Sequence, residues 1–444
     1  MKQALQYPIA GADASEIVQS IEDNIRREHI PNGAALPTVR ALAAALKVSP
    51  TTVAAAYRTL RTRGVLNAQG RRGTRVSARP PVVSRPVMKV ASHLRNLTFG
   101  NPDPDLLPDP QTALQRLDAW SQPRLYGGPI CRSGLLELAA RQFAADNIPA
   151  TSLAVLGGAL DAIERILQTQ VRPGDRVVVE DPGYGEIFDL LSALGLVVEP
   201  VAIDEYGLIP DALAQGLKSK AVACILTPRA QNPTGAALNE QRARDLRKIV
   251  DKYGEVLVIE DDHAGPVAGT PALTLCRPKK NRWAVVRSVS KSLGPDLRLA
   301  VVAGDETTIA RIQGRQSLGA GWVSHLLQNM VEILWSDPAT VEHLHLAAET
   351  YTTRRTALIA ALKTHGIPAY GRSGLNVWIP VPEEGSIVAS LAAAGWAVRG
   401  GEHYRIKSPQ AIRVTISTLK LDEAARLAED IARSLRPDWR THSA

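Results

Sequence analysis

Lys291 lies three residues after Ser288 and seven residues before Arg298, and these three side chains together could bind a reactive ligand. A lysine amine held near an aldehyde, with its pKa depressed, forms a Schiff base. A phosphate on the same ligand needs a hydroxyl group and a guanidinium group. The spacing therefore predicts a site for a ligand that carries both an aldehyde and a phosphate.

Four segments before this lysine offer further groups for such a ligand. The apolar run 256–261 ends at Asp261, which could pair with a protonated ring nitrogen and make the ring an electron sink. Asn232 opens a tight turn and could hydrogen-bond a phenolic oxygen, whereas Tyr184 offers a ring for stacking. The pair Gly157-Gly158 precedes a predicted helix and could cradle a phosphate with backbone amides. Each feature alone is also common in turns and caps, so the prediction depends on the whole set.

The elements around these residues indicate an α/β domain. Short β-branched runs at 176–180, 223–227, 256–261 and 283–288 alternate with helical stretches, which is typical of a mainly parallel sheet. The last hundred residues contain helices and short strands, for example 376–380 and 411–417, and predict a smaller α+β subdomain over about 330–440.

The first 78 residues predict a winged helix-turn-helix. Residues 14–28 place isoleucines on one helical face, a second helix opens at Leu36-Pro37-Thr38, and a third covers roughly 50–63 with Ser49 as its N-cap. Residues 65–68 and 74–77 then form a predicted hairpin. The proline-containing stretch 79–96 is interpreted as a linker to a domain over 97–440.

Charge supports a nucleic-acid partner for this N-terminal segment. Residues 1–80 hold twelve basic and five acidic residues, a net charge of +7 out of +8 for the whole chain. A basic segment beside a nearly neutral one indicates contact with a polyanion, although a solvated surface or a protein-binding winged helix is the alternative. The expected contacts to double-stranded DNA come from the third helix, the helix before it and the wing: Arg40, Thr51, Thr52, Arg71, Arg72 and Gly73.

Composition excludes several other classes of protein. Hydrophobic residues make up 45% and charged residues 22% of the 444, as in globular proteins that bury a large core. We find no membrane-length apolar run and no secretory signal in the sequence. The three cysteines, Cys131, Cys224 and Cys276, lack metal or disulfide spacing, which predicts a cytoplasmic protein without a bound metal.

Two stretches resemble known families. LPTVRALAAALKVSPTTVAAAYRTLRTRGVLNAQGRRGTRV resembles the N-terminal domain of GntR-family regulators. Residues 97–440 resemble fold-type I, class I/II aminotransferases, through the ordered segments around Gly158, Tyr184, Asn232, Asp261 and Lys291. The fusion as a whole resembles the MocR/GabR subgroup of GntR regulators.

The resemblance implies pyridoxal 5′-phosphate as cofactor and a role for each matching residue. Lys291 forms the Schiff base, Asp261 pairs with the pyridine nitrogen, Asn232 binds the 3-hydroxyl oxygen and Tyr184 stacks on the ring. His263 stands where the family usually has a tyrosine that reaches the ring oxygen. The remaining implied contacts are to the phosphate, from Gly158, Ala159, Ser288, Arg298 and the partner's Tyr126, and to an effector carboxylate, from Arg413.

The resemblance further implies a head-to-tail homodimer that regulates transcription. Its effector is either pyridoxal 5′-phosphate itself or an amine or amino acid that reacts with it. The alternative is a working aminotransferase with a DNA-binding appendage. Asn232 and Arg413 favour activity, whereas His263 argues against efficient turnover.

Overall fold

The computed structural model describes residues 6–62, 65–68, 73–77, 90–117, 125–277 and 282–436. The expected wing-tip contacts Arg71 and Arg72 lie outside these ranges, as do the predicted boundary at 78, most of the predicted linker and residues 437–440 of the predicted subdomain. The described chain divides into two compact units, and each is treated by itself.

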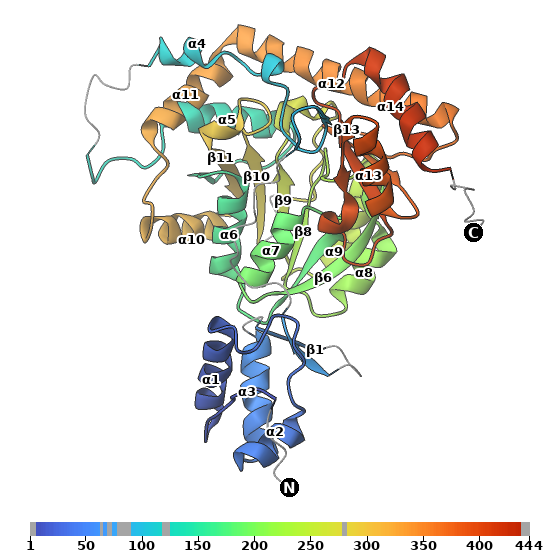
Figure 1. The fold of residues 1–444 in the computed structure, drawn as a ribbon. Coiled ribbons are helices and arrows are strands. Elements are labelled where there is room, and N and C mark those ends of the chain that lie inside the picture. The colour runs from blue at the N-terminus through green and yellow to red at the C-terminus, as the bar shows by residue number, and fades with distance from the viewer. Residues whose placement is uncertain are drawn as a thin grey trace, which may run out of the picture. The chain divides into compact units, whose positions relative to one another are not determined.

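The N-terminal unit contains the predicted three helices and hairpin. The helices are α1 (Ala14–Arg26), α2 (Val39–Leu46) and α3 (Pro50–Thr62), and the strands are β1 (Leu66–Ala68) and β2 (Thr74–Val76) (Figure 1). The second helix begins later than the opening at Leu36 because the Thr38 hydroxyl caps it, accepting from the Ala41 amide at 3.2 Å. Ser49 caps α3 as predicted, since its hydroxyl accepts from the Thr52 amide at 3.0 Å.

A separate apolar core holds this unit together. Ile17, Ile21, Leu42, Val53 and Leu60 are each fully buried in one cluster. The strands β1 and β2 pair antiparallel, and residues 34–36 bond to the outer side of β2. The helical periodicity read from the sequence is therefore confirmed, and the hairpin is anchored to the segment that precedes α2.

The C-terminal region is built on a mixed eight-stranded sheet. Its central strands β8, β9 and β10 are parallel, whereas β11 runs antiparallel to both β10 and β4. The strand order is β4 (Leu153–Leu156), β11 (Ala300–Gly304), β10 (Trp283–Ser288), β9 (Leu257–Asp262), β8 (Ala223–Leu226), β5 (Arg176–Asp181), β6 (Val197–Asp204) and β7 (Gly207–Leu208).

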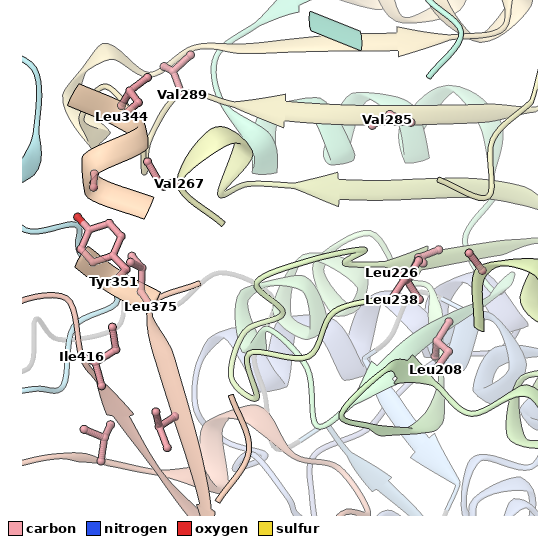
Figure 2. Packing of buried hydrophobic residues seen from close by; sticks show 14 of the residues in the cluster. Leu208, Leu226, Leu238, Val267, Val285, Val289, Leu344, Tyr351, Leu375 and Ile416 are labelled. Carbon is pink, nitrogen blue, oxygen red and sulfur yellow. The ribbon is translucent and has the colours of Figure 1, made fainter. Parts of the chain in front are cut away.

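Helices connect these strands and join them to the terminal part of the chain. The helices are α4 (Pro110–Leu114), α5 (Ser133–Ala145), α6 (Ala159–Gln170), α7 (Gly185–Ala193), α8 (Pro210–Leu217), α9 (Glu240–Lys252), α10 (Glu306–Ser317), α11 (His325–Ser336) and α12 (Pro338–Thr364). Side chains from the sheet, such as Leu226 and Val285, belong to the same buried cluster as Leu344 and Tyr351 of α12 (Figure 2). The central strands are buried on both faces, as expected for a covered parallel sheet.

The terminal subdomain carries a three-stranded antiparallel sheet, β12 (Asn376–Pro380), β15 (Ala411–Thr415) and β14 (Arg399–Gly400), with α13 (Glu384–Ala393) and α14 (Leu421–Ser434). A further strand, β13 (Trp396–Ala397), pairs in parallel with β3 (Arg95–Asn96). The prediction of a linker up to residue 96 was wrong at its end. Arg95 and Asn96 are part of a sheet because their backbone amide and carbonyl groups find partners on β13.

Candidate functional site

Lys291 follows β10 by three residues and is half-buried. Its ammonium group donates a hydrogen bond to the carbonyl oxygen of Gly100, in the segment that follows β3. Nothing in the spacing of the sequence indicated this contact, since Gly100 and Lys291 are 191 residues apart. The segment that follows β3 therefore contacts the amine of Lys291.

Asp261 lies on β9 directly opposite Val286 of β10, which brings its carboxyl group to the same edge of the sheet as Lys291. Burial raises the pKa of Asp261 to about 7, and the negative charge of Asp262 adds to this effect, while Lys291 opposes it. Its Oδ1 atom is buried and has no hydrogen-bond partner in the described part of the chain. A buried carboxyl oxygen in this state is suited to a donor brought by a ligand.

His263 points back toward this carboxyl group, with Nδ1 3.9 Å from Oδ2 of Asp261. Burial lowers the pKa of His263 to about 4, and the positive charge of Lys291 acts in the same direction. The imidazole is therefore neutral at physiological pH and carries one N–H donor. Sequence reasoning placed His263 near the site, and the structure agrees.

A buried ion network supports this edge of the sheet. Asp262 is bound by Arg229, with N–O distances of 2.8 and 2.9 Å, and by Nε of Arg287 at 2.8 Å. Arg287 also donates to Asp146 at 2.6 Å and stacks on Phe143 with its guanidinium 4.6 Å from the ring centre. Burial alone would raise the pKa of Asp262, but the two guanidinium groups outweigh it and hold the pKa well below its usual range. Sequence reasoning missed this network.

Gly158 and Arg298 form a cradle at the start of α6. Gly158 has a φ of +109°, and the Arg298 guanidinium lies 3.5 Å from the position a Cβ on this glycine would take. The first amides of α6, which begins at Ala159, face the same end of the helix. The Ser288 hydroxyl is 2.9 Å from the hydroxyl of Ser290, a residue that sequence reasoning did not select. Helix amides, hydroxyls and a guanidinium together suit a phosphate.

Asn232 and Arg413 are in direct contact, and Arg413 lies near Gly100. Arg413 donates to Oδ1 of Asn232 at 2.9 Å and also to the carbonyl of Thr98, and its guanidinium lies 4.8 Å from the ring centre of Tyr404. A Cβ on Gly100 would be 3.7 Å from the same guanidinium. The structure thus brings the two predicted residues into direct contact beside the segment that holds Lys291.

Asp181 joins the segment carrying Tyr184 to a loop of the terminal subdomain. Its carboxylate accepts from the amides of Ile406, Lys407 and Ser408 at 2.9, 2.7 and 3.1 Å, and from the Ser408 hydroxyl at 2.8 Å. Tyr184 lies three residues further and is half-buried. This carboxylate therefore organises a loop that begins directly after Tyr404.

Replacing Asp181 with alanine should raise the hydrogen-exchange rates of the amides of Ile406, Lys407 and Ser408 by roughly ten-fold or more, because each loses its acceptor. Mass-spectrometric exchange resolves this segment. Asp109→Ala, which removes the cap of α4, is the control and should leave the segment unchanged. Equal protection in both variants would show that the carboxylate does not hold the loop.

Glu180 is a second buried acid at this edge, and it predicts how stability depends on pH. Burial raises its pKa to about 8, partly offset by hydrogen bonds, including one from Gln231 at 3.2 Å. Between its unfolded pKa of 4.5 and about 8 the folded chain keeps a proton that the unfolded chain releases. The contribution of Glu180 to the free energy of unfolding should therefore be complete below about pH 4.5 and be lost as the pH rises toward 8.

Glu180→Gln should flatten this dependence without removing it, since burial also raises the pKa of Glu260 to about 7. The measurement is urea unfolding of the cofactor-free protein at a series of pH values. Glu342→Gln, at an exposed position of α12, is the control. A slope that is equal in the wild-type protein and in Glu180→Gln would contradict the assignment.

Tyr126, which the resemblance places at the phosphate of a partner subunit, lies on the surface of this chain. It is 91% exposed, and its ring contacts Trp322 edge-on at a centroid distance of 5.5 Å. Leu125 and Leu318 are also largely exposed.

Three of the predicted DNA contacts, Arg40, Thr51 and Gly73, are exposed on the surface of the N-terminal unit. Arg40 and Thr51 are exposed, and Gly73 has a φ of +82°, which favours glycine. The Thr52 hydroxyl instead bonds the Ser49 hydroxyl at 2.8 Å, within the cap of α3. The first turn of α3 therefore presents Thr51 rather than Thr52.

The described residues contain neither a candidate membrane-spanning helix nor a candidate metal-binding cluster. In these ranges we find no helix that combines the length and the apolarity needed to cross a bilayer. The same residues contain no group of three or more histidine, cysteine or acidic side chains placed to hold a metal ion.

Similarity to solved structures establishes the fold of the large unit. The kynurenine aminotransferase of Pyrococcus horikoshii matches with a TM-score of 0.71 at 20% identity, over 79% of this chain and 92% of that one. An archaeal alanine:glyoxylate aminotransferase matches with a TM-score of 0.69 at 22% identity, over 77% and 90%. The predicted fold-type I aminotransferase fold is confirmed.

Similarity to known sequences covers both parts of the chain. Residues 92–431 match the family of class I and II aminotransferases, and residues 13–76 match the gntR family of bacterial regulatory proteins. The vitamin B6 salvage pathway transcriptional repressor PtsJ of Salmonella typhimurium is 39% identical over 432 residues, 96% of this chain and 99% of that protein. The regulator TauR of Rhodobacter capsulatus is 27% identical over 82% of this chain and 83% of its own length.

These matches extend from the winged helix through the subdomain that contains Arg413, in the order expected from the sequence. The chain belongs to the MocR/GabR subgroup of GntR regulators, in which a helix-turn-helix domain precedes an aminotransferase-like domain.

Proposed function

We propose that this protein is a pyridoxal 5′-phosphate-dependent transcriptional regulator that binds operator DNA through its N-terminal domain. The carrying observation is the group of side chains around Lys291 in a chain that begins with a GntR-type domain. Residues 1–78 bind DNA, a linker follows, and residues 97–440 bind the cofactor. The protein acts in the cytoplasm, where bacterial DNA is found.

The residues at the site fit this cofactor. The buried Oδ1 of Asp261, which has no hydrogen-bond partner among the described residues, suits the pyridine N–H. The cradle of Gly158, Ala159, Ser288 and Arg298 suits the phosphate. When bound, pyridoxal 5′-phosphate supplies an aldehyde that reacts with amines and a ring that withdraws electrons.

The remaining side chains orient the ring and the effector. Lys291 supplies the amine that holds the aldehyde, and Tyr184 stacks on the ring. Because Oδ1 of Asn232 accepts from Arg413, its amide N–H group is directed to donate to the ring oxygen. The neutral imidazole of His263 provides a second donor in the same region. Arg413 grips a carboxylate when the effector is an amino acid.

A second copy of the chain completes the site. Tyr126 and the neighbouring Leu125 are 91% and 77% exposed, and adjacent exposed side chains of this size are typical of an interaction surface. A head-to-tail homodimer covers them and directs Tyr126 to the partner's phosphate. Such a dimer presents two winged helices and reads repeated half-sites.

The signal is either the cofactor itself or an amine or amino acid that reacts with it. The relative PtsJ is named a repressor of vitamin B6 salvage, which favours the cofactor as the first candidate to test. Fluorescence anisotropy with DNA from the upstream region of its own gene, using cofactor-free and cofactor-loaded protein, separates the two. Equal affinity rules out the cofactor as signal, and absence of salt-dependent, sequence-specific binding overturns the proposed function.

Replacing Arg40 with alanine should weaken binding to all DNA sequences about equally and reduce the slope of log affinity against log salt by about 1, because one phosphate contact is lost. Arg244→Ala, at an exposed position of α9, is the control that also removes one positive charge. An unchanged salt slope in Arg40→Ala would place the arginine outside the interface.

A working aminotransferase is the second candidate. The direct contact between Asn232 and Arg413 at 2.9 Å favours it. This pair joins the residue proposed to bind the cofactor ring to the residue proposed to bind a substrate carboxylate. Steady multiple-turnover conversion of an amino donor and a 2-oxo acid would support the enzyme. A spectral change on adding an amine, without turnover, would support the sensor.

A further inference from the structure

Helix α3 has two faces of different chemistry. Val53, Ala56, Tyr57 and Leu60 recur at helical spacing and are fully buried in the core of the N-terminal unit. The opposite face begins at Thr51 and is open to solvent. The orientation of the helix is therefore fixed by its packing, and so is the set of residues it presents.

The open face contains Thr51, Ala54, Ala55 and Arg58, since each alanine lies three or four residues from both Thr51 and Arg58. Thr51 and Arg58 are exposed, and the two alanines between them are half-exposed. Arg58 makes no ion pair or side-chain hydrogen bond with the described residues, so its positive charge is available to bind a DNA phosphate at the end of this face.

The first two turns lack the side chains that usually read guanine and adenine. From Pro50 to Tyr57 the sequence PTTVAAAY contains no arginine, lysine, asparagine or glutamine. The Tyr57 hydroxyl is used inside the protein, where it donates to the carbonyl of Pro37 at 2.8 Å, and the Thr52 hydroxyl is used in the cap. Methyl groups of Thr51, Ala54 and Ala55 therefore dominate this surface.

We propose that α3 reads thymine C5-methyl groups in the major groove, so that the half-site is specified by A·T pairs at the positions facing Thr51, Ala54 and Ala55. This inference rests on the proposed function. In the major groove the C5-methyl of thymine is the apolar group that distinguishes an A·T pair, and methyl groups of alanine and threonine commonly contact it. Arg58 lies a turn further along the helix and binds a backbone phosphate, which positions the face without adding base preference.

The test removes single methyl groups from the DNA and leaves the hydrogen-bonding groups in place. The full-length protein first selects duplexes from a randomised pool, and the selected half-site should be rich in A·T pairs. Each thymine of the best duplex is then replaced by deoxyuridine, and affinity is measured by fluorescence anisotropy. We expect the affinity to fall about four-fold at each contacted thymine, which is the effect of losing one buried methyl group. Substitution of thymines outside the half-site should leave the affinity unchanged.

A matched protein variant assigns the loss to the alanines. In Ala54→Ser/Ala55→Ser the deoxyuridine substitutions facing these positions should lose most of their effect, because the protein methyl surface is gone. Ala45→Ser, at an exposed position of α2, is the control and should respond to deoxyuridine like the wild type.

The outcomes separate this inference from the function on which it rests. Thymine reading is overturned if specific binding is unaffected by every deoxyuridine substitution, or if the selected half-site is rich in G·C pairs. In either case the proposed function as a regulator still stands. Absence of any specific duplex after selection overturns the proposed function and this inference with it.

Discussion

Replacing Lys291 with alanine is expected to give a folded protein that releases pyridoxal 5′-phosphate on dialysis. The phosphate cradle and Asp261 remain in this variant, but the amine that holds the aldehyde is lost. We expect the dissociation constant to rise roughly 100-fold or more, which corresponds to about 2.7 kcal/mol. DNA binding by the cofactor-free variant should match that of the cofactor-free wild type, whereas its response to the cofactor should disappear.

The absorbance spectrum after dialysis measures this effect directly, because the lysine-bound cofactor absorbs in the visible range. Lys248→Ala, which removes an exposed lysine from α9, is the control and should retain the cofactor. Retention of the wild-type spectrum by Lys291→Ala would mean that the cofactor is not held through this lysine.

Replacing Asp262 with alanine should produce the largest loss of stability among single changes at the site. The carboxylate is 1% exposed and binds both Arg229 and Arg287, so its removal leaves two buried guanidinium groups without their common partner. Breaking a buried ion pair on one side costs about 3–5 kcal/mol in the free energy of unfolding. Glu240→Ala is the contrasting change, since its pair with Arg244 is solvent-exposed and contributes less than about 1 kcal/mol.

Urea unfolding of both variants at neutral pH provides the comparison, and the pH dependence adds a second check. The pKa of Asp262 is lowered on folding, so its stabilising effect is complete above its unfolded pKa of 3.8 and is lost as the pH falls below that value. The difference between wild type and Asp262→Ala should therefore be constant from pH 5 to 8 and shrink in acid. A destabilisation below about 1 kcal/mol at pH 7 would contradict the role of the network.

Local patterns in the sequence predicted the strands that carry or precede the candidate site residues. Lys291, Asp261 and Asn232 each follow or end a buried strand, and periodicity identifies such strands within one or two residues. Parallel strands then bring these residues to one edge of the sheet. The contact between Asn232 and Arg413 was not predicted, because the two residues are 181 positions apart.

Contacts between distant segments could not be predicted in the same way. Asp262 meets Arg229 and Arg287 because β8, β9 and β10 are neighbours, and periodicity does not give the order of strands in a sheet. The expected strand 256–261 is observed one residue further along, at Leu257–Asp262. The pairing of Arg95 with Trp396 is equally invisible, since a two-residue strand has no periodicity.

The hydrogen bond from Lys291 to Gly100 places a main-chain acceptor on the amine that would react with an aldehyde. An amine that condenses with an aldehyde has fewer N–H bonds to donate, so a ligand and the main chain compete for the same nitrogen. Gly100 lies four residues after the end of β3, in the segment that follows the predicted linker. We therefore expect that a ligand bound to Lys291 changes the hydrogen bonding of Gly100. This glycine follows the linker that connects the DNA-binding domain to the cofactor-binding domain.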